Sequence, residues 1–339
     1  MKRLIFTFTL LCGFAVQSFA QAQPDPISNA ITEARELINE GNAKAAVAKL
    51  QSLPDVKETR VAQALGVAYY QAGELTRAIE TLAPVVDKLP QDSAQRREVV
   101  QALGLAYYIT GHLADSVPFL EQTSAWAPNN HEMTYALGMA YLQTRQSAKA
   151  RESFARMFRL APDSASAHLI TAQMMIRQET LEFAEAELKL AVEKDPKLPQ
   201  AHYLLGQIAV LRTRYDEGIQ LLEQEIAINP ANAMAYYKLG DAYTLQLKWD
   251  DAIAPLQKSI WLNPYYSGPY ILLGKTYLKK KNLSTAEAML KRAIQFDPNN
   301  KTAHYLLGQV YQQTARPDDA RREFEIAENL KDNLGKIEP

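Results

Sequence analysis

Cysteine is almost absent from this sequence, since Cys12 is the only one among 339 residues. It lies within the first twenty residues, so a chain cut after them has no disulfide, no thiolate nucleophile and no thiolate metal ligand. A marked excess of charge of either sign is also absent, because 37 basic residues face 38 acidic ones and the net charge is −1. This balance gives no electrostatic reason to expect nucleic acid or an anionic membrane as a partner.

Long hydrophobic runs are absent except for one short stretch near the N-terminus. Lys2 and Arg3 precede residues 4–16, which carry no charge, and small residues at 18 and 20 suit a cut after Ala20. Residues 1–20 are therefore predicted to be a cleavable signal peptide, which would make the chain periplasmic or secreted. The stretch is shorter than the about 20 apolar residues of a stable span, so no stable membrane span is expected after signal removal. The alternative is an uncleaved anchor or an interfacial helix.

The strongest positive signal is a fixed spacing of proline and glycine. From Pro128 to Pro298 a proline recurs every 34 residues. Glycines hold the same period, with Ala172 in the one missing slot, at Gly138, Gly206, Gly240, Gly274 and Gly308. Such self-similarity is typical of a stacked array, in which each unit buries its apolar face against its neighbours.

Each 34-residue unit has the pattern of two helices. In one unit Leu239, Gly240 and Tyr243 share a helical face, and Ala252 and Leu256 share the face of a second helix. Small residues at the Gly240 and Ala252 slots allow two helix backbones to approach closely. The following proline ends the second helix, and helix-capping side chains follow it at Asn130, Ser164, Asn232 and Asn300. No unit has the alternating β-branched pattern of a strand.

These residues resemble the tetratricopeptide repeat (TPR), whose signature is W-x₂-L-G-x₂-Y, then A-x₃-F, then P. Leu239–Gly240–Tyr243 and Leu307–Gly308–Tyr311 fit its first helix, and Ala150–Phe154 and Ala320–Phe324 fit its second. The resemblance implies an all-α fold, a right-handed superhelical solenoid of antiparallel helix pairs. The predicted organisation is a degenerate first repeat at 27–54, full repeats at 59–92, 97–130, 131–164, 165–198, 199–232, 233–266, 267–300 and 301–334, and a polar tail at 335–339. Four extra residues lie near 91–97.

Several partial matches to catalytic or ligand-binding motifs lack a residue at the required spacing. Gly274–Lys275–Thr276 ends like a phosphate-binding loop, but Gly268 stands one residue too far upstream. His131–Glu132 begins like a zinc-protease helix, but Tyr135 occupies the place of the second histidine. Three further histidines, His168, His202 and His304, hold one equivalent packing slot in different repeats. We therefore predict no catalytic residue, no cofactor, no metal site and no enzyme.

The resemblance implies that the first helix of each pair lines a concave groove. Carried over repeat by repeat, the exposed groove slots are predicted to be Tyr70, Tyr108, Tyr135, Met139, Gln173, Arg177, Tyr203, Gln207, Tyr237, Asp241, Lys275, Tyr305 and Gln309; the same face also takes in further polar residues such as Gln63. Tyrosines offer apolar area with a polar tip, and glutamines can pair with a peptide backbone. The alternative is that several of these tyrosines only pack against the neighbouring second helix.

The function expected from this pattern is binding without catalysis. The leading hypothesis is a scaffold or adaptor in the cell envelope or outside the cell, which binds a peptide or protein segment in the groove. The alternative is an accessory glycan-binding subunit of an envelope enzyme complex, because tyrosine platforms also suit sugars. Protein or peptide partners are expected, and nucleic acid is not.

Overall fold

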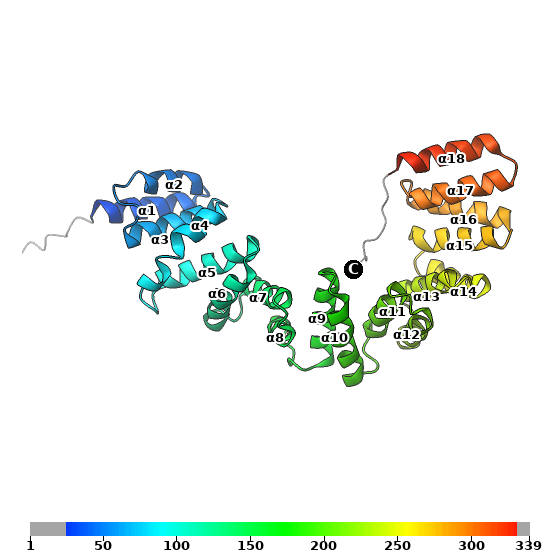
Figure 1. Ribbon diagram of the computed structural model, residues 1–339, viewed down its shortest axis with the longest axis horizontal. Helices are drawn as coiled ribbons and strands as arrows, with labels where there is room; N and C mark the ends of the chain where they lie inside the picture. The colour runs from blue at the N-terminus through cyan, green and yellow to red at the C-terminus, as the bar shows by residue number, and fades with distance from the viewer. Residues whose placement is uncertain (1–24, 331–339) are drawn as a thin grey trace, which may run out of the picture. The chain divides into compact units, whose positions relative to one another are not determined.

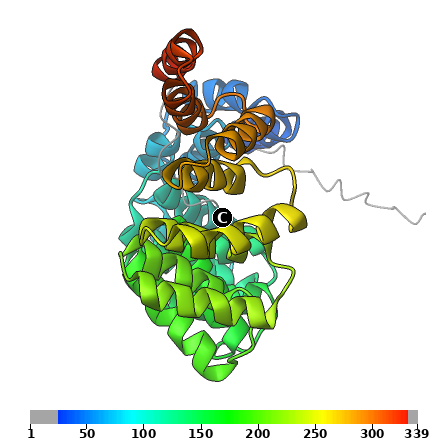
Figure 2. The same ribbon diagram turned by 90° about the vertical axis from the view of Figure 1, so that its right-hand side faces the viewer.

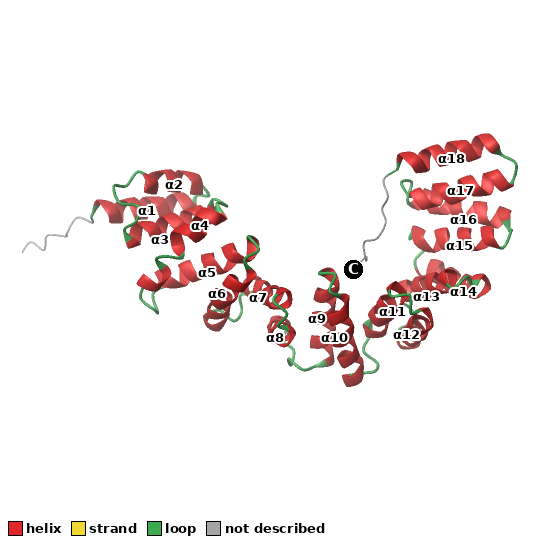
Figure 3. Ribbon diagram, in the orientation of Figure 1, coloured by secondary structure: helices red, strands yellow, loops and turns green. Residues whose placement is uncertain are grey.

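The computed structural model describes residues 25–330 of the chain. Within this range it contains the α-helices α1 to α18, joined by turns, and no strand (Figure 3). The all-α fold predicted from the repeat is confirmed for the described range. The predicted signal peptide, residues 1–20, and the predicted polar tail, residues 335–339, lie outside it.

The chain divides into two compact units, Met1–Phe119 and Leu120–Pro339, and helix α6 (Leu113–Trp126) contains the point of division. The other helices of the first unit are α1 (Pro26–Asn39), α2 (Ala43–Gln51), α3 (Thr59–Gln71), α4 (Leu75–Leu82), a short 3₁₀ helix η1 (Val86–Lys88) and α5 (Ala94–Ile109). In this unit α1 packs against α2 and α3 against α4, and the first helices α1, α3 and α5 contact one another in sequence (Figure 1). Ala34, Leu50 and Leu65 belong to its buried core.

The four extra residues near 91–97 are accommodated by an early start of α5. The Ser93 side chain accepts a hydrogen bond from the backbone N–H of Arg96 and caps the helix. The predicted repeat start at residue 97 therefore falls inside α5, which begins three residues earlier at Ala94. Arg96 is only 8% exposed. Its guanidinium donates to the backbone carbonyl of Val86 and lies 3.3 Å from a carboxylate oxygen of Asp87, which ties η1 to α5.

Helix pairs continue through the second unit. They are formed by α7 (His131–Gln143), α8 (Ser147–Met157), α9 (Ala165–Arg177), α10 (Leu181–Lys194), α11 (Ala201–Leu211), α12 (Tyr215–Ile228), α13 (Ala233–Leu245), α14 (Trp249–Leu262), α15 (Ser267–Lys279), α16 (Leu283–Phe296), α17 (Lys301–Gln313) and α18 (Pro317–Asn329). Each helix from α8 to α17 contacts both its predecessor and its successor (Figure 2). This is the packing of a linear array, in which a repeat touches only its neighbours.

The repeated glycine lies where the two helices of a pair cross. A Cβ built on Gly138 would stand 2.6 Å from the ring of Phe154, and one on Gly206 would stand 2.8 Å from Leu222. Each of these partners lies sixteen residues after its glycine, and the same separation holds at Gly66, Gly240, Gly274 and Gly308. The prediction that this slot permits close approach of two helices is confirmed.

Two positions in the turns recur from repeat to repeat, a helix-capping residue and a residue with a left-handed backbone. The side chains of Asn130, Ser164, Asn232 and Asn300 each accept a backbone hydrogen bond at the start of a first helix, so the predicted caps are confirmed. Between the two helices of a pair, one residue has a left-handed backbone. It is glycine at 41, 73 and 111, but in the second unit it is Arg145, Glu179, Thr213, Leu247, Lys281 and Ala315, with φ between 55° and 63°. Within the described range, no helix has both the length and the apolar character that a bilayer span requires.

Candidate functional site

All thirteen predicted groove residues lie on first helices of their pairs, from α3 to α17. Their exposure differs. Three are exposed, namely Tyr135, Arg177 and Tyr305, and eight are half-buried, namely Tyr70, Tyr108, Gln173, Tyr203, Tyr237, Asp241, Lys275 and Gln309. Most of the predicted slots therefore have one side against the protein and one side open to solvent.

The prediction of an exposed slot is wrong for Met139 and Gln207. Met139 is 3% exposed and Gln207 is 5% exposed. Asp241, Lys275 and Gln309 hold the same slot directly after a crossing glycine and are half-buried, so the slot alone does not determine burial. Neither residue can contact a ligand without rearrangement of the repeat.

Two of the predicted tyrosines take part in packing. Tyr203 packs against the cluster of apolar residues that contains Leu222 and Leu239. Tyr237 packs in the next cluster, and its ring meets that of Tyr266 edge-on, with 5.1 Å between ring centroids. These contacts support the alternative that such tyrosines join neighbouring repeats, so their replacement would test stability as well as binding.

Several charged residues lie close to Tyr237 on α13. The Lys238 ammonium lies 5.1 Å from the centroid of the Tyr237 ring. Burial raises the pKa of Asp241, while the charges of Lys238 and Lys275 oppose the rise. The structure thus brings three predicted residues, Tyr237, Asp241 and Lys275, into one neighbourhood. On α9, by contrast, Gln173 donates a hydrogen bond of 3.1 Å to Gln200, outside the predicted set.

One cavity on a first-helix face lies within the first unit. It has a volume of about 490 Å³, within the range typical of ligand sites. Helices α1, α3 and α5 supply its walls, and we call it the first-helix pocket. Its lining consists of Ala34, Arg35, Ile38, Asn39, Gln63, Ala64, Val67, Gln71, Ala94, Gln95 and Glu98.

The first-helix pocket combines an apolar floor with polar walls. Ala34, Ala64 and Val67 are buried and form apolar surface beneath it. The side-chain amide of Gln63 donates a hydrogen bond of 2.9 Å to the Glu98 carboxylate, and the Arg35 guanidinium lies 3.8 Å from the same group. One carboxylate is thus shared by two donors, and the remaining wall side chains are largely amides.

Of the residues that line the pocket, the sequence analysis named Gln63 alone, as a further polar residue of the predicted face. Tyr70 and Tyr108 lie on α3 and α5 but do not line the pocket. Arg35 and Asn39 were missed because the first repeat is degenerate, so no groove slots were carried onto it. The polar residues Gln63 and Gln71 stand on one helical face with Val67, and that spacing was the available signal.

The signature tyrosines mainly join one repeat to the next. The hydroxyl of Tyr141 donates a hydrogen bond of 2.5 Å to Glu121, and that of Tyr243 donates one of 3.3 Å to Glu223. The bond from Tyr141 holds the pKa of Glu121 below its usual value. The pKa of Tyr141 is raised by burial and by the same bond. Both tyrosines therefore remain protonated donors near neutral pH.

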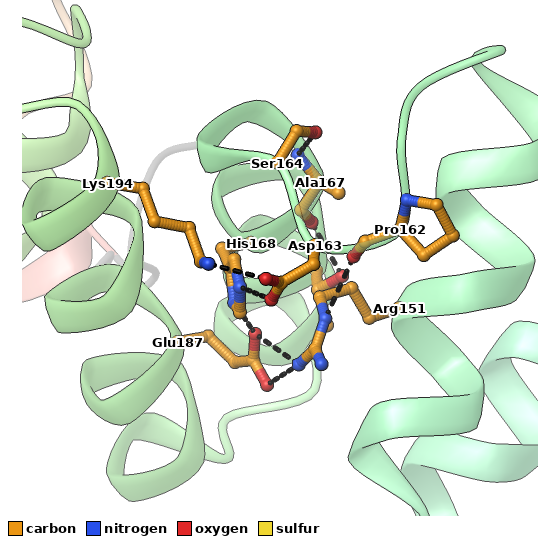
Figure 4. Close-up of polar contacts among 9 residues, drawn as sticks. Arg151, Pro162, Asp163, Ser164, Ala167, His168, Glu187 and Lys194 are labelled. Carbon is orange, nitrogen blue, oxygen red and sulfur yellow. Dashed lines mark hydrogen bonds and ion pairs between the residues drawn. The ribbon is translucent and has the colours of Figure 1, made fainter.

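The buried His168 belongs to a polar network between α8, α9 and α10 that extends to the surface at Asp163 (Figure 4). Its Nδ1 is 2.6 Å from a Glu187 oxygen, and its Nε2 is 3.2 Å from Asp163. Arg151 Nη1 lies 2.9 Å and 3.2 Å from the two Glu187 oxygens, and Lys194 reaches Asp163 at 2.6 Å. Figure 4 shows these side chains converging from successive helices, so the network joins two repeats.

The same histidine slot recurs and has a structural role. His304 Nδ1 lies 2.6 Å from Glu323, as His168 Nδ1 does from Glu187, and in both cases the glutamate comes nineteen positions after the histidine. His168, His202 and His304 are all buried. The interpretation of this slot as a packing position is confirmed. Among the described residues, no group of three or more His, Cys, Asp or Glu side chains is placed to hold a metal.

Comparisons with known proteins agree with this architecture. Profiles described as tetratricopeptide repeat match residues 135–199, 184–232 and 203–266, and a TPR repeat profile matches 274–314. Together they cover about half of the chain. No curated protein matches by sequence.

Among solved structures, MamA from Desulfovibrio magneticus RS-1 is 21% identical, with 50% of this chain and 95% of MamA covered and a TM-score of 0.46. YrrB, described as a TPR protein with an unusual peptide-binding site, is 20% identical over 55% of this chain and 95% of its own, with a TM-score of 0.46. PilF of Pseudomonas aeruginosa is 19% identical over 57% and 88%, with a TM-score of 0.47.

Repeats of this family act as scaffolds for protein–protein interaction and are generally non-catalytic. With its helix pairs, its crossing glycines and these profile matches, the chain belongs to the tetratricopeptide repeat family.

Proposed function

We propose that the chain is a non-catalytic scaffold of the cell envelope or the extracellular space that holds a segment of a partner protein in the first-helix pocket. The observation that carries this proposal is the cavity between α1, α3 and α5, with its buried apolar floor and amide walls. An extended peptide presents alternating donors and acceptors along its backbone. A glutamine or asparagine amide can pair with both kinds of group.

Charge in the first-helix pocket favours a partner segment that is close to neutral. Glu98 is already engaged by Gln63 and by Arg35, so neither charge is left without a counterpart. The apolar floor of Ala34 and Val67 suits a small aliphatic side chain of the segment. Affinity would then depend little on salt, because no large field attracts the ligand.

The location proposed for this scaffold rests on the N-terminal sequence. Lys2 and Arg3, the uncharged residues 4–16 and the small residues before the cut after Ala20 have the order of a cleavable signal. The mass of the protein recovered from the periplasm or medium tests this part. A mature chain beginning at Gln21 supports it, whereas a chain retaining residues 1–20 contradicts it.

Photo-crosslinking in cells tests the pocket. A photoreactive amino acid replaces Gln71 or Gln95, both of which are exposed at the pocket wall. The matched control is Lys44, which is exposed on the second helix α2. We expect crosslinks from Gln71 and Gln95, but not from Lys44, to one protein, mapping to one short segment. Crosslinks to glycan alone, or equal labelling from all three positions, would reject a protein-binding pocket.

A further inference from the structure

The repeat at 233–266 departs from all others at two positions outside the first-helix faces. Trp261, near the end of α14, is 72% exposed, and Tyr265, in the following turn, is 76% exposed. The 34-residue period supplies an internal comparison for both slots. The equivalents of Trp261 are Arg159, Glu193, Ala227, Gln295 and Asn329, and those of Tyr265 are Asp163, Lys197, Ala231 and Asn299. Within residues 25–330, this repeat alone has large aromatic residues at these two slots.

Two cations accompany these aromatic rings. The Lys258 ammonium lies 3.8 Å from the centroid of the Trp261 ring. Tyr265 meets Phe296 edge-on at 5.8 Å between centroids, and the Arg292 guanidinium lies 4.5 Å from the Phe296 centroid. These contacts hold the rings in place before any partner arrives, which lowers the entropy cost of binding. All these residues belong to the second unit.

The two cations lack acidic partners within residues 25–330. No carboxylate lies within ion-pair distance of Lys258 or Arg292 there, whereas the neighbouring Lys291 is paired with Glu287. Arg292 instead donates a hydrogen bond of 2.5 Å to the neutral side chain of Gln295. The charge of this surface is therefore positive and uncompensated.

We propose that one surface of the second unit docks a short acidic segment of a partner protein. This surface, which we call the Trp261 surface, consists of Lys258, Trp261, Tyr265 and Arg292. Exposed tryptophan and arginine are the residue types that most often carry the energy of protein interfaces. The carboxylates of the segment pair with Lys258 and Arg292, and its apolar side chains cover the two exposed rings. This site is separate from the first-helix pocket and does not depend on the function proposed for that pocket.

Two other occupants fit the observations less well. A second copy of the same surface would bring Lys258 and Arg292 against their own equivalents, which is repulsive. A flat anionic membrane would also contact the same slots of the adjoining repeats, because equivalent positions in a stacked array face the same side. Those slots offer neither apolar anchors nor cations, since they hold Ala227, Ala231, Gln295 and Asn299. A compact acidic partner matches a patch confined to one repeat.

Selection from a random displayed-peptide library on the purified chain tests this proposal. Three variants are compared with the parent: Trp261→Ala/Tyr265→Ala, the charge reversal Lys258→Glu/Arg292→Glu, and a control, Leu211→Ala/Leu245→Ala, which removes two exposed apolar residues elsewhere in the second unit. We expect the parent to select peptides rich in Asp and Glu. A synthetic copy of the most enriched peptide should lose about tenfold in affinity for the first two variants and stay within about twofold for the control. Added salt should weaken its binding.

The charge reversal provides the sharpest result, because it keeps both aromatic rings. Selection on Lys258→Glu/Arg292→Glu should enrich basic peptides in place of acidic ones. The proposal is overturned if no selected peptide depends on Trp261 and Tyr265, or if those peptides are not acidic. It is also overturned if these residues instead control sedimentation with vesicles of phosphatidylcholine and phosphatidylglycerol, or self-association in light scattering. Circular dichroism of each variant checks that the helices are intact.

Discussion

Arg214 Nη2 lies 2.8 Å from Glu185 Oε2, across the boundary between two successive repeats. Glu185 stands on α10 and Arg214 caps α12, so the pair spans 29 residues of sequence. Arg316 and Glu287 form the same pair with the same separation, at 3.1 Å. Burial opposes the ionisation of Glu185, but hydrogen bonds from Lys189 and Arg214 outweigh it and hold the pKa of Glu185 below its usual value.

Replacing Glu185 by Gln should therefore destabilise the chain in a pH-dependent way. A carboxylate with a lowered pKa contributes stability that is complete above its unfolded pKa, about 4.3, and is lost as pH falls through the lower folded value. We expect Glu185→Gln to cost about 1–2 kcal/mol at neutral pH, reduced by the partial exposure of the arginines. The difference from the parent in urea unfolding should shrink below about pH 4. A difference independent of pH would contradict this origin.

The crossing of Gly138 and Phe154 predicts strong coupling between the two positions. A Cβ at residue 138 would meet the buried Phe154 ring at 2.6 Å, so Gly138→Ala should cost about 1–3 kcal/mol. The repeat at 165–198 naturally pairs Ala172 with Leu188. Adding Phe154→Leu should therefore recover part of the loss, and the double variant should be less destabilised than the sum of the two single variants. If the changes in the free energy of unfolding of the two single variants simply add in the double variant, residues 138 and 154 are not coupled.

The left-handed turn residues offer a route to higher stability. Thr213 has φ of 60°, which is unfavourable for a β-branched residue, whereas the equivalent Gly73 adopts φ of 77° without strain. Thr213→Gly should stabilise the chain by about 0.5–1 kcal/mol after allowing for the greater freedom of glycine in the unfolded chain. The control Thr213→Ala keeps its Cβ and should gain less. Urea midpoints for the three chains check this order.

His202 predicts a second step in stability nearer to neutral pH. Its Nδ1 has no hydrogen-bond partner, and burial lowers its pKa, although the charge of Glu225 opposes the shift. A buried neutral histidine binds fewer protons than the unfolded chain, so stability is complete above about pH 6.5 and falls as pH drops below that value.

Tyrosine is the matched replacement at this slot. The equivalent Tyr270 donates a hydrogen bond of 3.0 Å to the carbonyl of Pro264. We expect His202→Tyr to flatten the dependence of the melting temperature on pH between about pH 7 and pH 5. If parent and variant melt in parallel over this range, His202 is not the group responsible.

Much of the fold follows from the 34-residue period, because the period is local. Gly240, the capping Asn232 and the helix-ending Pro264 each act on residues within one repeat, so their spacing predicts the helices. The start of α5 at Ala94 does not follow from the period, because the four extra residues interrupt it and because Arg96 contacts Val86 of η1, which has no counterpart in the other described repeats of the period.

The candidate site was less accessible from sequence. Groove slots were transferred by position, and position does not determine burial, as Met139 and Gln207 illustrate. The first-helix pocket depends on Arg35 and Glu98, which are 63 residues apart and meet only when α1, α3 and α5 lie together. The sequence shows that Trp261 departs from the residues at equivalent slots. The contact of its ring with Lys258 and the absence of an acidic partner for that lysine among the described residues are properties of the folded chain.

Six of the repeated glycines meet a large partner sixteen residues later within the same repeat, namely Gly66, Gly138, Gly206, Gly240, Gly274 and Gly308. A stretch of 34 residues therefore carries both halves of its own helix crossing. Deleting or duplicating one such stretch leaves each remaining crossing whole, whereas a deletion of another length between a glycine and its partner changes the spacing that the crossing requires. The length of this array can thus change in whole repeats without a new interior having to evolve.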